Sequence, residues 1–239
     1  MKTGMQKQNS GVLIILEGID GSGKRTQAEL LIKRLKRAGY AVEIKSFPQY
    51  GKKSAGMVEE YLNGAYGEAN AVNPFAASLF FALDRFDAAR DIRRWLSDGK
   101  IVVLDRYTDS NVGHQGGKIT DENERRRFLE WLYHEEYALM EIPKPDLVLI
   151  LHVPAGTGQK LVGKKQPRKY LAGGRSHDAH EQNLSHLEAA ERAYLWLARE
   201  RPDDHIVIEC TKGGAMLSPM AIHQNVWKII EGKLEEETT

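Results

Sequence analysis

A glycine-rich segment between two regular elements is the feature that most constrains how this chain can fold. The apolar run Val12–Glu17 (VLIILE) predicts a buried strand, and residues 24–38 predict a helix. In this strand–loop–helix context, glycines let successive backbone N–H groups point at an anion, and a lysine places its ammonium among phosphate oxygens. The sequence therefore predicts a phosphate-binding loop rather than a plain strand–helix turn. Its residues are Gly18, Gly21, Ser22, Gly23, Lys24, Arg25 and Thr26.

Apolar runs that alternate with helical patterns predict the rest of the fold. Near-continuous Val, Ile and Leu runs indicate strands that are covered on both faces, as in a parallel sheet. Repeated strand–helix units favour an α/β fold, an open, doubly wound, five-stranded parallel sheet flanked by helices on both faces. We expect one domain over residues 11–239, after a disordered tail at residues 1–10. The expected strands are 12–17, 41–47, 101–105, 147–153 and 205–209, and the expected helices are 24–38, 74–96, 121–139, 181–199 and 218–231.

Charge and composition exclude several classes of protein. Lysine and arginine number 34 against 33 acidic residues, and this balance argues against a dedicated nucleic-acid or membrane binder. Cys210 is the single cysteine, so no intramolecular disulfide is possible. No apolar stretch approaches the roughly 20 residues that a membrane-spanning helix needs, and the polar residues 1–10 do not look like a signal peptide. We therefore expect a cytoplasmic protein with no nucleic-acid or membrane partner.

One segment, at about residues 156–180, interrupts the alternation of strands and helices. It contains five glycines, four lysines and two arginines, and it shows little apolar periodicity. Loops of this length without structure of their own are usually functional or disordered. We interpret the segment as a mobile lid, and a solvated basic loop is the alternative.

Charged residues also follow the third expected strand, which ends in Asp105, Arg106 and Tyr107. In parallel sheets ligands bind at the carboxyl edge, although a buried Asp–Arg pair can also be purely structural. The phosphate loop itself departs from the usual pattern, because Arg25 stands where a hydroxyl would bind magnesium and Thr26 follows one residue later. We therefore expect Mg²⁺ near Asp105 and Thr26, held directly or through water.

Several motifs, in order, resemble those of the thymidylate kinase family over nearly the whole chain, from residue 12 to about 230. They are EGIDGSGKRTQ at 17–27, FPQYG at 47–51, FALDRFDA at 81–88, DRYTDSN at 105–111, HQGGK at 114–118 and PKPDLVLIL at 143–151. Each motif is short, but their joint order is specific. The resemblance implies a P-loop kinase fold with a lid, a homodimer, and transfer of a phosphate from ATP–Mg²⁺ to dTMP, which gives dTDP.

The resemblance also implies roles for individual residues. It places Arg85 and Arg106 on the acceptor phosphate and Phe81 against the base. The implied catalytic residues are Lys24, Asp105, Arg106 and Arg168, and ATP binding falls to the loop residues together with Thr211. The implied dTMP-binding residues are Asp20, Phe47, Pro48, Tyr50, Leu62, Phe81, Arg85, Arg106, Ser110, Asn111, His114 and Gln115.

The family shows two patterns for its catalytic basic residue. Some members carry an arginine inside the phosphate loop, and others have glycine there and supply basic residues from the lid. This chain has Gly21 at that position and resembles the second pattern, with Arg168 as the first choice. The other basic residues available in the lid are Lys164, Lys165, Lys169 and Arg175.

Alternatives remain open for some residues and for the function. Phe81 fits an ordinary core position, Arg85 a solvated helix charge and Gln115 a polar loop residue. His114 stands where relatives carry an aromatic residue, which puts the shape of the pocket in question. The acceptor can be another nucleotide such as dUMP, or a deoxynucleoside. A low-turnover nucleotide-binding regulatory protein is the alternative outside enzymes.

Overall fold

The central sheet has five parallel strands. The computed structural model describes residues 11–68, 70–162 and 184–238, and the expected tail at 1–10 lies outside them. The strand order is β2-β3-β1-β4-β5, so the predicted five-stranded parallel sheet is confirmed. The strands are β1 (Val12–Glu17), β2 (Val42–Ser46), β3 (Ile101–Asp105), β4 (Leu147–His152) and β5 (His205–Glu209).

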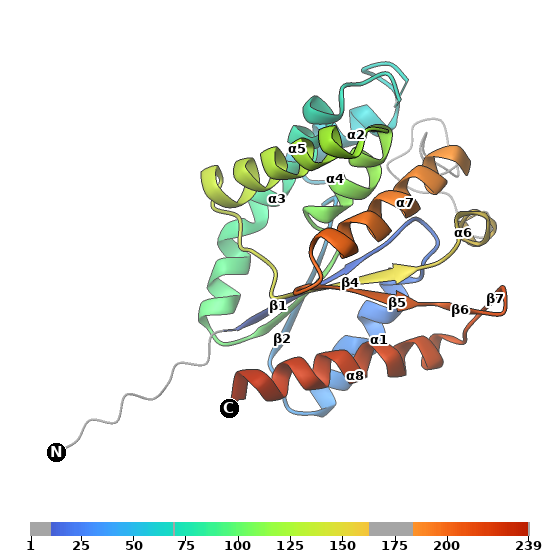
Figure 1. Ribbon diagram of the computed structural model, residues 1–239. Helices are drawn as coiled ribbons and strands as arrows, with labels where there is room; N and C mark the ends of the chain where they lie inside the picture. Colours follow the sequence, from blue (N-terminus) through green and yellow to red (C-terminus); the bar gives the residue numbers. More distant parts are fainter. Residues whose placement is uncertain (1–10, 69, 163–183, 239) are drawn as a thin grey trace.

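Helices cover both faces of this sheet, as Figure 1 shows. On β1, Ile14 and Leu16 pack with side chains of α1 (Lys24–Arg37) and α8 (Pro219–Thr238). Leu13 and Ile15 point to the opposite face, where α3 (Pro74–Ser97) and α7 (Leu184–Glu200) cover them. Because successive side chains of a strand alternate between faces, a continuous apolar run such as β1 fits only a strand that is covered on both sides.

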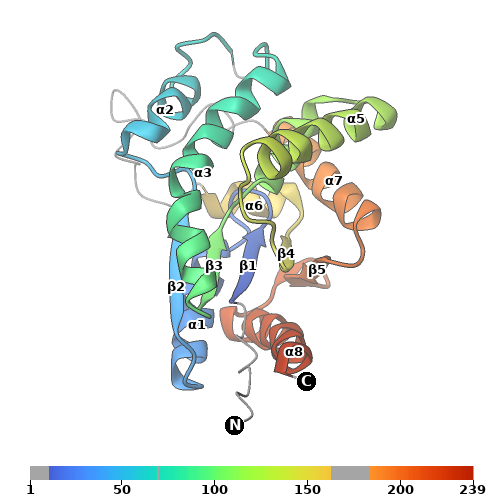
Figure 2. The same cartoon turned by 90° about the vertical axis from the view of Figure 1, so that its left-hand side faces the viewer.

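Shorter elements surround the carboxyl edge of the sheet, where Figure 2 shows β1 and β3 ending. The expected helix 121–139 is divided into α5 (Glu122–Tyr133) and a π-helical turn, η3 (His134–Leu139). Helices α2 (Gly56–Leu62) and α4 (Asp109–His114) were not predicted, because each has fewer than eight residues and too few turns to show a periodic pattern. The elements are η1 (Lys53–Ala55), α2 (Gly56–Leu62), α4 (Asp109–His114), η2 (Gly116–Lys118), α5 (Glu122–Tyr133), η3 (His134–Leu139), α6 (Ala155–Val162), β6 (Thr211–Lys212) and β7 (Ala215–Met216).

The beginning of the expected lid differs from the prediction. Residues 156–162 belong to the helix α6 rather than to a segment without regular structure. Residues 163–183 lie outside the described part of the chain, so the lid and Arg168 stay predictions. Among the described residues, no helix is both long and apolar enough to span a membrane.

Candidate active site

The phosphate loop leaves β1 and enters α1 at Lys24. The Lys24 Nζ atom donates hydrogen bonds to the carbonyl oxygens of Gly18 (2.9 Å) and Ile19 (2.8 Å), so the ammonium lies inside the curve of the loop. Burial lowers the pKa of Lys24 to about 8, and the charge of Arg106 acts in the same direction, against Asp20 and the other nearby carboxylates. An anion in the loop would favour the charged form of this lysine.

Two glycines bring the phosphate loop into close contact with α6. A Cβ atom built on Gly21 would lie 2.3 Å from the carbonyl oxygen of Gly158, and one built on Gly158 would lie 2.8 Å from that of Asp20. Gly21 also has a φ of 86°, which side-chain-bearing residues rarely adopt. The first helix after β4 therefore rests directly on the backbone of the loop.

Arg106 joins the phosphate loop to α4. Its Nη2 atom donates to Asp20 Oδ1 (2.7 Å), and its Nη1 atom contacts Ser110 Oγ (3.3 Å) and His114 Nε2 (3.0 Å). The residue has a φ of 70°, in the left-handed region that costs a non-glycine residue about 1–2 kcal/mol. Such strain persists only where surrounding contacts impose it, and it is common at functional sites.

Arg106 determines which ring nitrogen of His114 acts as the acceptor. An arginine has only donors, so His114 Nε2 accepts from Arg106 and the ring proton lies on Nδ1. That nitrogen lies 3.2 Å from Nε2 of His186 on α7, and the two rings stack 5.4 Å apart. The histidine that departs from the family pattern thus orients Arg106.

Glu17, at the end of β1, lies beneath this group of side chains and is fully buried. Its carboxylate accepts hydrogen bonds from the backbone N–H of Tyr107 (2.7 Å) and from the hydroxyls of Ser110 and Tyr194 (2.8 Å each). Burial raises the pKa of Glu17, and the charge of Arg106 opposes this. One carboxylate thus ties together β1, α4 and α7.

A buried ionic cluster fixes α4 against β5. His205 Nε2 lies 2.9 Å from Asp109 Oδ2, and its Nδ1 lies 2.6 Å from Asp204 Oδ1. Tyr133 donates a third hydrogen bond, to Asp109 Oδ1 (2.6 Å). Burial lowers the pKa of His205, but the two carboxylates outweigh it and raise that pKa to about 9. The imidazole is therefore a buried cation at neutral pH.

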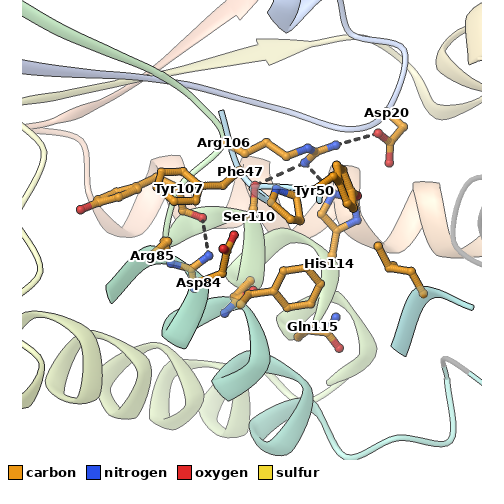
Figure 3. Close-up of a pocket in the computed structure, with 14 residues that line it drawn as sticks. Asp20, Phe47, Tyr50, Asp84, Arg85, Arg106, Tyr107, Ser110, His114 and Gln115 are labelled. Carbon is orange, nitrogen blue, oxygen red and sulfur yellow. Dashed lines mark hydrogen bonds and ion pairs between the residues drawn. The ribbon is translucent and has the colours of Figure 1, made fainter. Parts of the chain in front are cut away.

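A pocket of about 610 Å³, counted with its open mouth, lies between the phosphate loop, α3 and α4. Figure 3 shows Asp20 and Arg106 along one side of it and Arg85 on the opposite side. All twelve side chains predicted to bind dTMP line this pocket. They are Asp20, Phe47, Pro48, Tyr50, Leu62, Phe81, Arg85, Arg106, Ser110, Asn111, His114 and Gln115. Two further residues that were not predicted, Asp84 and Tyr107, line the pocket as well.

Asp84 and its neighbours shape the wall next to Phe47. The Asp84 carboxylate accepts hydrogen bonds from the backbone N–H of Gln49 (2.8 Å) and from the Ser54 hydroxyl (2.6 Å). These bonds hold the turn after β2 against α3, and the Phe47 ring lies 5.8 Å from that of Tyr107. The signal for Asp84 was present in the sequence, since it directly precedes Arg85 in the FALDRFDA motif.

Arg85 is buried rather than solvated, which excludes one of the alternatives. It reaches the pocket from α3, whose start is fixed by Pro74 and by the Asn73 side chain accepting from the N–H of Phe75 (2.8 Å). Its Nε and Nη2 atoms donate to the two carboxylate oxygens of Glu136 (2.7 and 2.5 Å). Burial lowers the pKa of Arg85, but the Glu136 charge outweighs it and raises that pKa. No motif in the sequence pointed to Glu136.

The other predicted site residues lie at three places. Asp105 ends β3, half-buried, and its charge acts on Lys24. Arg25 and Thr26 are exposed on the first turn of α1, where Arg25 Nε pairs with Glu29 (3.1 Å). Thr211 lies in β6, after β5 at one edge of the sheet. Among the described residues, no group of three or more metal-binding side chains is suited to hold an ion.

The family to which the chain belongs follows from comparison with known proteins. The family model of thymidylate kinase matches residues 16–214. The chain belongs to the thymidylate kinase family. It is 32% identical over 191 residues to the thymidylate kinase of Mycobacterium tuberculosis, across 79% of this chain and 86% of that protein. It is 28% identical to the human thymidylate kinase over 228 residues, across 95% and 93% of the two chains.

A solved structure agrees on the fold. The thymidylate kinase of Candida albicans superposes with a TM-score of 0.68 at 22% identity, over 94% of this chain and 92% of that one. The predicted P-loop kinase fold is therefore confirmed. Membership makes the chain a nucleoside monophosphate kinase, since phosphorylation of dTMP is the function of the thymidylate kinase family.

Proposed function

We propose that this protein transfers the terminal phosphoryl group of ATP to dTMP, with the donor phosphates in the Lys24 loop and the acceptor in the pocket beside it. The observation that carries the proposal is the position of Arg106, which contacts Asp20 of the loop and also lines the pocket. Phosphoryl transfer requires mainly positioning and positive charge around the transferring oxygens. Lys24 supplies that charge at the donor phosphates, and Arg106 supplies it at the acceptor phosphate.

The contacts of Arg106 prepare it for an acceptor phosphate. Asp20, Ser110 and His114 fix the guanidinium before any ligand arrives, so little reorganisation is needed when charge develops in the transition state. A planar guanidinium can also hold two phosphate oxygens at once, which an ammonium cannot do. Arg106 is therefore the residue that we assign to the acceptor phosphate.

Arg85 contributes to the acceptor in a different way. Glu136 neutralises it, and it lies across the pocket from Asp20 and Arg106 (Figure 3). A neutral ion pair attracts a dianionic phosphate weakly, but its remaining N–H groups can donate to a neutral oxygen of the acceptor. We therefore propose that Arg85 binds the nucleoside part, in place of the phosphate contact expected from sequence.

Magnesium fits the oxygen ligands that are present, because Mg²⁺ prefers carboxylates, water and nucleotide phosphates over protein cages. Asp105 would hold the ion or its waters, with the Thr26 hydroxyl nearby, and the ion would neutralise charge on the donor phosphates. We further propose that Arg25 and Thr211 contact ATP and that Arg168 completes the charge from the lid. A cytoplasmic location remains a prediction of the sequence.

A homodimer is also part of the proposal. Leu79, Leu83 and Phe86 are 37%, 50% and 51% exposed, and helical spacing places them on the face of α3 opposite Phe81 and Arg85. An apolar stripe of this kind suits a second copy of the chain, because a twofold interface uses the same patch on both subunits. Leu83→Glu should convert the dimer to monomers in sedimentation velocity, whereas Leu139→Glu, at another exposed leucine, should not. A monomeric wild type would contradict this assignment.

The deciding experiment measures ADP release over a panel of acceptors. The panel contains dTMP, dUMP, dGMP and thymidine, each with ATP and Mg²⁺. The highest kcat/KM is expected for dTMP. Preference for another monophosphate would correct the acceptor, and nucleotide binding without turnover would favour a regulatory protein.

A further inference from the structure

The buried ion pair between Arg85 and Glu136 has a geometry that stability alone does not explain. Their side chains are 2% and 0% exposed, and the carboxylate of Glu136 takes both an Nε and an Nη2 donor of Arg85. The Thr108 hydroxyl donates a third hydrogen bond to Glu136 Oε2 (2.9 Å). Removing two charges from water costs about as much as their attraction returns, so an apolar pair of similar size would stabilise the fold as well or better.

The two partners differ in their access to the pocket. Arg85 lines it, whereas Glu136 comes from the turn η3 behind α3 and does not. Of the five N–H groups of a guanidinium, those donated to Glu136 and to the Tyr107 carbonyl oxygen (3.2 Å) account for three among the described residues. One N–H on each terminal nitrogen is therefore left for a molecule in the pocket.

We propose that Glu136 is a positioning residue for the acceptor pocket. Its carboxylate fixes the plane of the Arg85 guanidinium and neutralises its charge, so that the two remaining N–H groups are presented to the acceptor at one angle. The inference rests on the proposed function, since it takes the pocket as the acceptor site. Without Glu136, Arg85 would be a buried, unpaired cation free to turn away.

The test compares two substitutions with a matched control. Glu136→Gln keeps the shape of the side chain but turns an N–H₂ group towards the donors of Arg85. Glu136→Asp keeps the charge on a shorter side chain. Glu135→Gln makes the same chemical change one residue away, at a half-buried glutamate.

The measurements are KM for dTMP, KM for ATP and kcat, at a temperature where each variant is folded by circular dichroism. Glu136→Gln should raise KM for dTMP at least tenfold and leave KM for ATP within twofold. Glu136→Asp should recover part of the loss, and Glu135→Gln should match wild type. Arg85→Ala should add less than threefold in the Glu136→Gln background, because the two residues act as one unit.

An unchanged KM for dTMP in folded Glu136→Gln, or equal losses for dTMP and ATP, would overturn the proposal. If Glu136→Gln does not fold, Thr108→Val replaces it, because it removes the hydrogen bond from the Thr108 hydroxyl to Glu136. This variant should raise KM for dTMP two- to fivefold and leave KM for ATP unchanged. An unchanged KM for dTMP would count against the inference. Failure of the proposed function is seen separately, in the wild type. If another monophosphate is the preferred acceptor, the same ratios are measured with that nucleotide.

Discussion

Replacing Arg106 by glycine should separate catalysis from stability. The guanidinium is assigned to the acceptor phosphate, whereas the backbone of this residue is strained at a φ of 70°. Glycine removes the side chain and the strain together, and alanine removes the side chain alone. The pair of variants therefore distinguishes the two effects of one residue.

The stability terms nearly cancel for Arg106→Gly. Loss of the 2.7 Å contact to Asp20 removes a charge-assisted hydrogen bond, worth about 1.5–3 kcal/mol. Both side chains are 15% exposed, so water can replace part of it. Relief of the left-handed backbone returns about 1–2 kcal/mol, less about 0.5–1 kcal/mol for the greater freedom of glycine in the unfolded chain. The net loss should be below about 2 kcal/mol, and Arg106→Ala should be about 1 kcal/mol less stable than Arg106→Gly.

The loss of catalytic activity in these variants should not be offset by any opposing effect. Removing a fixed charge from a transferring phosphate costs roughly 10²–10³ in rate, so kcat/KM for dTMP should fall at least a hundredfold in both variants. Steady-state kinetics and urea unfolding provide the two measurements. If kcat/KM stays within tenfold of wild type, Arg106 does not hold the acceptor phosphate; if alanine is as stable as glycine, the backbone strain has been misjudged.

Three further results are expected. Lys24→Met should lower kcat by roughly 10²–10³ in a folded protein, because its ammonium is the cation inside the loop; turnover near wild type in stopped-time assays would refute this. Arg25→Ala should leave the Mg²⁺ dependence of activity and the melting temperature of the ligand-free protein nearly unchanged, since an exposed pair with Glu29 contributes little. A clear loss of Mg²⁺ affinity, or a clear drop in the melting temperature, would show that Arg25 has a structural role. In urea unfolding, the charge-dependent part of the stability advantage of wild type over His205→Asn should be complete below pH 6.5 and should be lost as the pH rises through 9, a change on the order of 1–3 kcal/mol, because the folded state raises the pKa of His205. A pH-independent difference would contradict the buried cation.

Strands β1, β3 and β4 were predictable because each carries a run of apolar residues that only a doubly covered sheet can bury, whereas β2 (VEIKS) is half-buried or exposed along its length. Val12–Glu17 and Ile101–Asp105 have the expected bounds. The start of the lid was less predictable, because glycines at 156 and 158 suggested a loop where α6 forms. Gly158 is needed there for close approach to the phosphate loop rather than for flexibility, and a sequence does not distinguish these two uses of glycine.

The pocket lining was predictable wherever residues belonged to a motif. Phe81 and Arg85 are four residues apart on one helix, and both line the pocket. The supporting contacts were not predictable, since Glu17, Glu136 and His186 each bind partners that are distant in sequence and come close only in the folded chain. No local pattern marks Glu136 as the partner of Arg85, 51 residues away.

The contact between Gly21 and Gly158 restricts how this enzyme can evolve. A member of the family that carries arginine in its phosphate loop needs room for that side chain, but here the space next to residue 21 is filled by the backbone of α6. A single Gly21→Arg substitution would therefore have to displace α6 before it could supply a charge. A change from the glycine pattern to the arginine pattern therefore requires at least two substitutions, one in the phosphate loop and one in α6. A protein with only one of them would have neither the close packing of loop and helix nor a well-placed loop arginine. The phosphate loop and α6 would in this sense have to change together.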